Sequence, residues 1–192
     1  LFVRYNVENQ IEKMFLRDVP LPSGGRIVID RTEALTAIDV NSGRTKSKNV
    51  ENTVTQANLE AADEIANQAI LRDLGGLVVI DFIDMMDPKN RRKVQQRLKE
   101  SFKPDKAKAN FGRISQFGLM EMSRQRLRSG VVARFSTTCQ HCLGLGYTRE
   151  TSSSALHILR RLRELAVSGK PGLITVNAPV EVANFMQNSL RD

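Results

Sequence analysis

A segment with helical spacing, set between strand-like segments at residues 26–41 and 77–80, constrains the fold more than any other feature of this sequence. From residue 51 to residue 74, small and apolar residues recur at the spacing of an amphipathic helix, and Gly75-Gly76 predicts its end. The run at 77–80 is continuously apolar, which is typical of a strand covered on both faces. Because strands and helices alternate, the order favours an α/β or α+β domain over residues 20–128.

The first strand-like segment, residues 26–41, predicts a β-hairpin. Its two apolar runs, 26–30 and 34–41, are joined by a polar turn and bounded by turn-forming residues on both sides. Side chains alternate between the two faces of a strand, so Asp39 and Asn41 are expected to point the same way.

Asp87-Pro88 predicts the start of a basic helix that runs to about Phe102. Aspartate is a favoured N-cap residue and proline a favoured first helical residue. Two shorter segments, 109–115 and 118–123, are expected to be strands. These elements extend the alternation of helices and strands to the end of the domain.

The last part of the chain predicts a second, smaller unit. A knuckle-like turn over residues 139–146 is followed by a helix over residues 155–167, which the serines at 152–154 would cap. A strand over residues 173–176 and a helix after Pro179 complete the unit. One strand between two helices buries little surface, so this small α/β domain is expected to be truncated or completed by a partner.

Positive charge is concentrated in one stretch. The 192 residues include 29 Lys and Arg and 21 Asp and Glu; 14 of these basic residues but only four of the acidic ones fall between Asp87 and Arg134. This stretch carries +10 whereas the whole chain carries +8, which favours a phosphate backbone as partner. The alternative is a solvated face of the basic helix. Aromatic residues make up 5%, with no Trp, so no stacking platform for single-stranded bases is visible.

The sequence contains no apolar run with the length of a membrane span. Its first residues lack both an initiator Met and the segments of a signal peptide. We therefore expect no transmembrane segment, and we expect the chain to be a piece of a cytosolic protein.

Asp39 and Asp81 are the leading catalytic candidates, because each ends an apolar strand, where α/β sheets present functional side chains. Two adjacent carboxylates repel each other, and Mg²⁺, which prefers carboxylate, water and phosphate oxygens, would neutralise them. Asn41 would orient one of these ligands. Such a site suits metal-assisted hydrolysis of a phosphodiester. Alternatively, both aspartates cap helices or pair with arginines. Asp84 would join the metal, act on a water or begin the next turn.

Cys139 and Cys142 are the only cysteines and form half of a zinc site. A structural zinc takes four ligands, so two chains that each contribute this pair would complete the site and link a homodimer. The alternative is an idle or redox-active CxxC pair. His141 is poorly placed to reach the same ion as Cys142, and His157 falls inside a helix, where packing or exposure is favoured. No nucleophile–histidine pair is therefore expected.

Five stretches of the sequence resemble the bacterial ribonuclease E/ribonuclease G family. They occur in the family's order across nearly the whole chain. They are residues 21–25 (LPSGG), 32–43 (TEALTAIDVNSG), 58–66 (NLEAADEIA), 74–85 (LGGLVVIDFIDM) and 117–126 (FGLMEMSRQR).

The resemblance implies a DNase I-like mixed sheet with flanking helices, followed by a CxxC zinc-link and a small partial α/β domain. It divides the chain into a connecting segment (1–19), a DNase I-like catalytic subdomain (20–134), a zinc-link (135–150) and an incomplete dimerisation domain (151–192). The family's OB-type RNA-binding domain and 5′-monophosphate sensor have no counterpart in this sequence.

The resemblance also implies an activity. Family members are Mg²⁺-dependent endoribonucleases that cut single-stranded, often AU-rich RNA in rRNA processing, other RNA processing and mRNA decay, leaving 5′-phosphate and 3′-hydroxyl ends. The two magnesium-binding aspartates map onto Asp39 and Asp81, and the supporting asparagine onto Asn41. Lys108 falls where the family has a basic residue near the scissile backbone. The expected RNA contacts are Lys106, Lys108, Arg113 and Arg124.

The partners implied are RNA and a second copy of the chain. Cys139 and Cys142 would share one Zn²⁺ with the same pair of another chain, giving a homodimer and, in the full-length protein, a tetramer. The resemblance implies a cytoplasmic protein, peripheral at the inner membrane in the full-length form. The competing interpretation is a non-catalytic module that binds RNA and dimerises through zinc.

Overall fold

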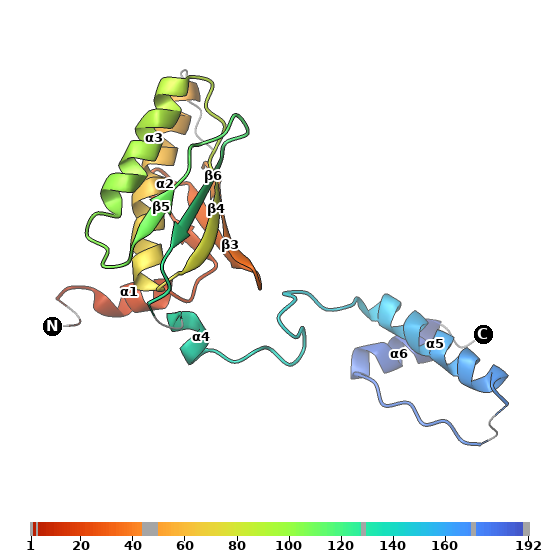
Figure 1. The fold of residues 1–192 in the computed structure, drawn as a ribbon. Coiled ribbons are helices and arrows are strands. Elements are labelled where there is room, and N and C mark those ends of the chain that lie inside the picture. Colours follow the sequence, from red (N-terminus) through yellow and green to blue (C-terminus); the bar gives the residue numbers. More distant parts are fainter. Residues whose placement is uncertain (1, 3, 44–49, 128–129, 170–171, 190–192) are drawn as a thin grey trace. The chain divides into compact units, whose positions relative to one another are not determined.

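The computed structural model describes residues 2, 4–43, 50–127, 130–169 and 172–189. The chain forms two compact units, Leu1–Ser136 and Thr137–Asp192 (Figure 1).

A six-stranded sheet forms the centre of the first unit, in the order β1-β2-β3-β4-β6-β5. Its strands are β1 (Asp18–Pro20), β2 (Arg26–Arg31), β3 (Leu35–Asn41), β4 (Gly76–Asp81), β5 (Ala109–Phe111) and β6 (Leu119–Arg124). β3 and β4 are parallel, and the other neighbouring pairs are antiparallel. The predicted hairpin is confirmed as β2 and β3, and the mixed sheet agrees with the predicted fold class. Only the first part of the strand expected over 109–115 joins the sheet.

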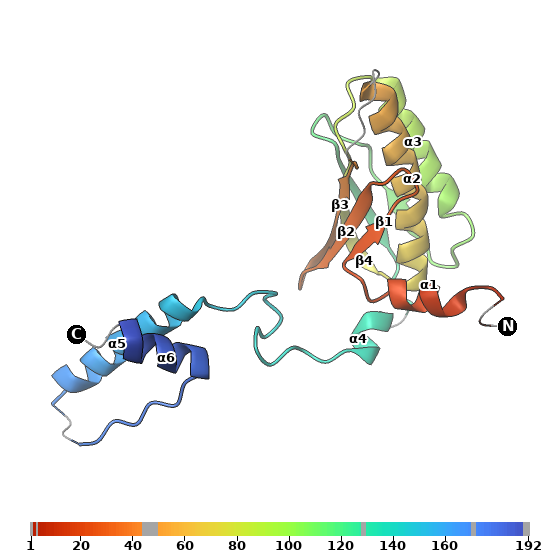
Figure 2. The ribbon, with the colours of Figure 1, turned by 180° about the vertical axis from the view of Figure 1, so that it is seen from behind.

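Two long helices, α2 (Val50–Leu71) and α3 (Pro88–Ser101), lie side by side against one face of the sheet (Figures 1 and 2). The predicted cap of α3 is confirmed, because the Asp87 side chain accepts a hydrogen bond from the Lys89 N–H at 2.8 Å. The unit also contains the short helices α1 (Val7–Lys13) and α4 (Val131–Phe135). None of the described helices is both long and apolar enough to cross a membrane.

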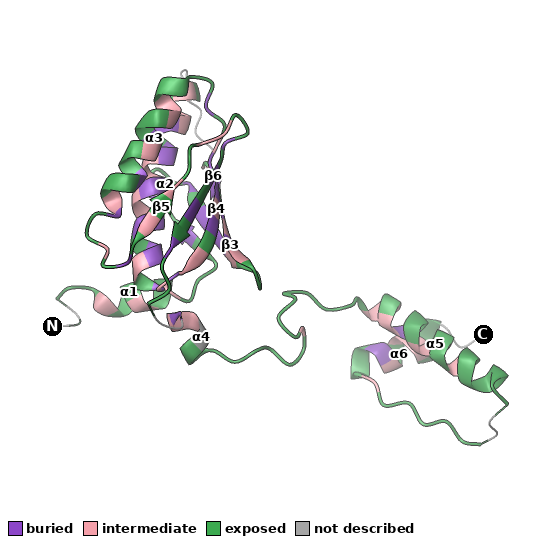
Figure 3. Ribbon diagram, in the orientation of Figure 1, coloured by how far each residue is buried: buried purple, intermediate pink, exposed green. Residues whose placement is uncertain are grey.

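The core lies between these helices and the sheet (Figure 3). β3, β4 and β6 contribute alternate residues to it, among them Ile38, Ile80 and Met120, which are at most 1% exposed. α2 contributes small residues such as Ala61 and Ala62, both 0% exposed, which let its backbone approach the strands. Full burial of each larger side chain stabilises the fold by roughly 1.5–3 kcal/mol, so this layer fixes the positions of the strand ends.

The expectation that residues 77–80 form a strand covered on both faces is wrong. Val78 and Ile80 face the helices and are buried, but Leu77 is 44% exposed. The described helices α2 and α3 cover only one face of the sheet, so β4 has a buried and an open side. A run of apolar residues hides this alternation, because Leu77 and Val79 are as apolar as their buried neighbours.

In the second unit, α5 (Thr151–Val167) and α6 (Val180–Ser189) pack against each other. The predicted serine cap of α5 is wrong: the helix begins at Thr151, and its N-cap is Glu150, whose carbonyl accepts the Ser154 N–H at 2.8 Å. The strand expected over residues 173–176 does not form, and Leu173 is 95% exposed. Among the described residues of this unit no other strand is available to pair with it.

Candidate active site

Asp39 and Asp81 occupy matching positions at the ends of neighbouring strands. β3 and β4 run in parallel, and Asp39 and Asp81 are register partners in the ladder. Both are exposed, whereas Ile38 and Ile80, the residues before them, are buried among the helices. Side chains alternate along a strand, so the two carboxylates lie beside each other on the open face of the sheet.

Asn41 completes this pair on the same face. Its side-chain amide Nδ2 donates a hydrogen bond to Oδ2 of Asp39 at 2.5 Å. The contact fixes the orientation of the Asp39 carboxylate and leaves its other oxygen for a ligand. The alternation of β3 predicts this arrangement, in which residues 39 and 41 share a face.

The two aspartates line a shallow hollow of about 450 Å³. Asp84 and Phe117 also border it, as do the backbone segments that follow β3 and β4. The described residues that line it are Asp39, Val40, Asn41, Ser42, Asp81, Phe82, Ile83, Asp84 and Phe117. Three carboxylates around one open hollow make a region of negative potential that favours a cation.

Desolvation and the charges in the hollow both act on Asp81. Partial desolvation raises the pKa of the Asp81 carboxyl, and the negative charges of Asp39 and Asp84 raise it further. Each of these effects penalises the ionised form of Asp81. A bound cation would offset that penalty, because its positive charge favours the ionised form of the carboxylates.

Helix α2 holds the segment that follows Asp81. Asn58 is fully buried, and its amide Nδ2 donates to the Ile83 carbonyl at 2.8 Å while its Oδ1 accepts the Ile83 N–H at 3.1 Å. Near the start of the same helix, the Glu51 carboxylate accepts the backbone N–H groups of Met86 and Asp87, both at 3.2 Å. The backbone from 83 to 87 is therefore fixed to the helix layer on the far side of the sheet.

A tight turn between β5 and β6 supports the same segment. Gly118 has φ +78°, and a Cβ atom there would lie 2.6 Å from the Phe82 carbonyl oxygen. The Phe82 N–H in turn donates to the Gly118 carbonyl at 3.2 Å. Only glycine allows this approach, because the position combines a left-handed backbone with a close backbone neighbour. The turn places Phe117, 69% exposed, at the border of the hollow.

The expected RNA contacts fall into two groups. Lys106, Lys108 and Arg113 are exposed on the segments around β5. The Arg124 side chain is only 3% exposed and donates to Asp105 at 2.6 and 3.1 Å and to Asp73 at 2.9 Å. The position of Arg124 therefore differs from the expected one: its guanidinium is inside the fold and joins three segments of the chain.

The basic helix α3 lies on the other side of the sheet from Asp39 and Asp81. Its buried residues Val94 and Leu98 contact the core that the helices share with the sheet. The sheet therefore separates the positive charge of α3 from the carboxylate pair. This position agrees with the alternative interpretation, in which the basic residues of α3 form a solvated helix face.

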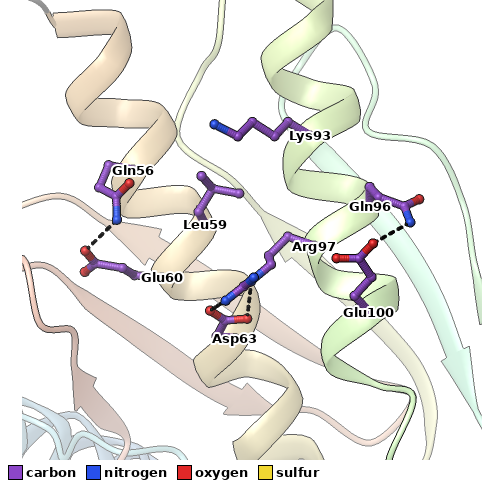
Figure 4. A pocket seen from close by; sticks show the side chains of 8 residues that line it. All are labelled: Gln56, Leu59, Glu60, Asp63, Lys93, Gln96, Arg97 and Glu100. Carbon is purple, nitrogen blue, oxygen red and sulfur yellow. Dashed lines mark hydrogen bonds and ion pairs between the residues drawn. The ribbon is translucent and has the colours of Figure 1, made fainter.

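A second hollow, about 410 Å³, lies between α2 and α3 (Figure 4). Its polar side chains bind one another: both Asp63 oxygens accept from Arg97, at 2.7 and 2.8 Å, and glutamines bind Glu60 and Glu100. The Asp63–Arg97 pair joins the two helices, whereas each glutamine binds a glutamate of its own helix, and all of these groups lie in the layer away from the aspartates. We therefore interpret this hollow as part of the packing between α2 and α3.

Cys139 and Cys142 lie in a tight turn of the second unit. The Leu143 N–H donates to the Cys139 carbonyl at 2.8 Å. Backbone N–H groups of Gly146 and Gly144 lower the pKa of the Cys142 thiol. Hydrogen bonds that favour the thiolate make a cysteine a better metal ligand and a better nucleophile. The turn therefore suits metal binding by sulfur.

Each candidate metal site rests on two side chains of this chain. No group of three or more His, Cys, Asp and Glu side chains that could hold a metal occurs among the residues the structure describes. The aspartate pair fits Mg²⁺, which usually takes one or two carboxylates and fills its other positions with water and phosphate oxygens. The cysteine pair fits half of a zinc site, which needs two further ligands.

Comparison with known proteins identifies the family. The family model for the ribonuclease E/G family matches residues 1–127, and a second model, the RNase E/G thioredoxin-like domain, matches residues 138–192. The chain belongs to the ribonuclease E/G family. The resemblance inferred from the five sequence stretches is thereby confirmed.

Individual relatives align along the whole chain or most of it. Ribonuclease E of Haemophilus influenzae is 50% identical over 192 residues, and ribonuclease E of Escherichia coli is 48% identical over 192 residues; both alignments cover 100% of this chain. Ribonuclease G of Salmonella typhimurium is 37% identical over 163 residues, 84% of this chain. The chain spans 20% and 18% of the two ribonuclease E proteins and 33% of the ribonuclease G protein.

The sequence of this family member did not indicate the residues that fix the backbone beside Asp81. Asn58, Glu51 and Gly118 each contact the backbone that follows Asp81. One signal was present for Asn58, a polar residue within the small and apolar face of α2. A buried polar group must find a partner, so that position predicts an unusual contact without identifying it.

Proposed function

We propose that this chain carries the catalytic carboxylates of a Mg²⁺-dependent endoribonuclease. Its substrate is single-stranded, AU-rich RNA, cut during RNA processing and mRNA decay in the cytoplasm. The observation that supports this most directly is the register pairing of Asp39 with Asp81 on the open face of the sheet. The relatives named ribonuclease E and ribonuclease G support the reaction class.

Asp39 and Asp81 would hold the Mg²⁺ ion, and Asn41 keeps the Asp39 carboxylate in position through its hydrogen bond. When bound, the ion lowers the pKa of water and stabilises negative charge on the phosphate. Asp84, the third carboxylate at the hollow, would orient the attacking water. These side chains position the water and the phosphodiester relative to each other.

The proposed products follow from which bond breaks. The water oxygen forms a bond to phosphorus, and the bond between phosphorus and the 3′ oxygen breaks. The 3′ oxygen leaves with the electron pair and takes up a proton. The downstream fragment then carries a 5′-phosphate and the upstream fragment a 3′-hydroxyl.

Lys106, Lys108 and Arg113 would contact the RNA backbone, because all three are exposed. Contacts of this type give affinity without sequence preference and depend strongly on salt. We do not include Arg124, whose guanidinium is buried against two carboxylates.

The test is cleavage of a short fluorescent, single-stranded, AU-rich RNA with Mg²⁺, with EDTA and by the Asp39→Asn and Asp81→Asn variants. We expect cleavage only by the unmodified chain with Mg²⁺, while both variants still bind the RNA. Asp18→Asn, at an exposed position of the edge strand β1, is the matched control and should cleave normally. RNA binding with no cleavage by the unmodified chain would instead favour the non-catalytic module.

We also propose that Cys139 and Cys142 share one Zn²⁺ with the same residues of a second chain. The turn that holds the two thiols and the lowered pKa of Cys142 support a zinc ligand role. The link would produce a homodimer, which in a full-length protein would assemble further into a tetramer.

A further inference from the structure

An exposed aromatic ring borders the carboxylate hollow. Phe117 lines the hollow together with Asp39 and Asp81, and 69% of its surface is exposed. Leu119, the register partner of Asp81 on β6, is 40% exposed. Apolar surface therefore continues from the aspartate pair along the neighbouring strand and its turn.

The backbone that carries this ring is fixed. The Phe117 N–H donates to Oγ of Ser115 at 3.2 Å, and the Gly118 N–H donates to the Ser115 carbonyl at 3.2 Å. The Ser115 N–H in turn donates to the Leu119 carbonyl at 2.8 Å. Gly118 also packs directly on the Phe82 carbonyl. A side chain on such a turn is positioned relative to Asp81, although most of its own surface contacts solvent.

We propose that Phe117 stacks on an unpaired RNA base next to the phosphodiester that is cut. This inference rests on the proposed function, since it assigns a base-binding role at the same site. The aspartates bind the phosphate only through a cation, so they give no contact to the base. An aromatic face supplies that contact for any base, because every base has a π-face.

Stacking on Phe117 also selects single-stranded RNA. In a duplex both faces of a base are covered by its neighbours, and freeing one face costs unstacking energy. An unpaired base offers its face to Phe117 without that cost. The residue therefore positions the substrate and contributes to its specificity, and it takes no part in bond breaking.

The test measures RNA binding with Ca²⁺ in place of Mg²⁺, so that a cation still holds the phosphate, and gel electrophoresis checks that the RNA stays intact. A short single-stranded RNA is compared with versions that each have one base removed, and binding is measured for the unmodified chain, Phe117→Leu and Phe117→Trp. We expect removal of one particular base to weaken binding by roughly 5- to 100-fold, the range typical of stacking on an aromatic side chain. Phe117→Leu should weaken binding of the intact RNA similarly, lose most of this sensitivity, and leave the melting temperature unchanged. Phe117→Trp should retain it.

Phe15→Leu is the matched control. Phe15 is also exposed, at 46%, but it is not among the residues that line the carboxylate hollow. It lies in the segment after α1, where Arg72, which follows α2, donates to the carbonyls of Lys13 and Leu16. This control should bind every RNA as the unmodified chain does. Equal sensitivity to base removal in the unmodified chain and in Phe117→Leu would overturn the stacking proposal.

The two proposals fail in different ways. Mg²⁺-dependent cleavage with no base-sensitive position would overturn the stacking role and leave the nuclease assignment standing. If binding depends on one base through Phe117 but no RNA is cleaved, the nuclease assignment is overturned and the base contact of Phe117 stands. A chain that binds no RNA would overturn both.

Discussion

The side-chain amide of Asn58 on α2 binds both the N–H and the carbonyl of Ile83, two residues beyond Asp81. The two bonds join the helix layer to the backbone that follows the second catalytic candidate. Asn58 is 0% exposed, so neither of its polar groups can turn to water instead.

Replacing Asn58 with leucine should destabilise the fold and impair the site. The change leaves the Ile83 N–H and carbonyl without their partner, and each unsatisfied buried group costs about 1–3 kcal/mol. We expect the free energy of unfolding in urea to fall by about 2–5 kcal/mol. RNA cleavage by the folded variant should fall too, because the backbone beside Asp81 is released.

Asn67→Leu is the control for this variant, since Asn67 is an exposed residue of the same helix. Surface changes of this kind usually alter stability by no more than about 0.5 kcal/mol. Equal stability of the two variants would refute the role assigned to Asn58.

Asp81 should lower the stability of the unliganded fold at neutral pH. Its pKa is raised in the folded chain, first by desolvation and then by Asp39 and Asp84. A carboxyl with a raised folded-state pKa favours folding while it is protonated, and this contribution is lost as the pH rises through that pKa. In EDTA, Asp81→Asn should therefore melt at a higher temperature than the unmodified chain at neutral pH, and the difference should disappear in acid.

Mg²⁺ should raise the melting temperature of the unmodified chain and have a smaller effect on Asp81→Asn, because a ligand that binds only the folded state stabilises it. Asp18→Asn should respond to Mg²⁺ as the unmodified chain does. Identical responses in all three proteins would rule out a magnesium site at Asp81.

Arg124 should be a stability residue. Its guanidinium, 3% exposed, pairs with Asp105, whose side chain is 4% exposed, and with Asp73. Removing one member of a buried ion pair typically costs about 3–5 kcal/mol, because the remaining charges stay buried without a partner. We expect Arg124→Met to lower the unfolding free energy by about this amount. The exposed pair of Arg17 and Asp30 gives a control: Arg17→Met should cost no more than about 1 kcal/mol.

Lys108, unlike Arg124, should contribute to RNA binding and not to stability. Because it is exposed, Lys108→Gln should leave the melting temperature unchanged. It should weaken RNA binding to a similar extent for different sequences and reduce the slope of log affinity against log salt by about one. Fluorescence anisotropy at several salt concentrations measures both quantities. An unchanged salt slope would remove Lys108 from the RNA contact.

The cysteine pair predicts a defined zinc content. If two chains share one ion, metal analysis should give about half a zinc per chain, following from the four ligands of a structural zinc. Cys142→Ser should lose the zinc and sediment as a monomer. Lower pH should also weaken the dimer, because protons compete with the metal for the thiolates. One zinc per monomer would contradict the shared site.

The sequence was sufficient to predict the two strand ends. Asp39 and Asp81 each follow an apolar run, and the helical segment between those runs implies a crossover that makes the two strands parallel. Strand polarity then brings both residues to one edge of the sheet. Local pattern was enough here because each strand end and the helix between them is indicated by its own stretch of sequence, although Asp39 and Asp81 themselves are far apart in the chain.

Other features depend on contacts between distant residues and could not be predicted in this way. Asn58 and Ile83 are 25 residues apart, and nothing in either local sequence identifies the other. Arg124 counts as one more positive charge in the sequence, although in the fold it is neutralised by Asp73 and Asp105. The apolar run at 77–80 indicates a strand but not which side of it remains open.

Because the helices that the structure describes cover only one face of the sheet, the other face is open to the proposed RNA substrate. The described helices α2 and α3 lie on one face, while Asp39, Asp81 and Leu119 are exposed on the other. A strand of RNA can be laid across such a surface at any point along its length, with no terminus to be threaded through an opening. For the proposed nuclease, this open face would give an internal stretch of RNA the same access to the aspartates as a chain end.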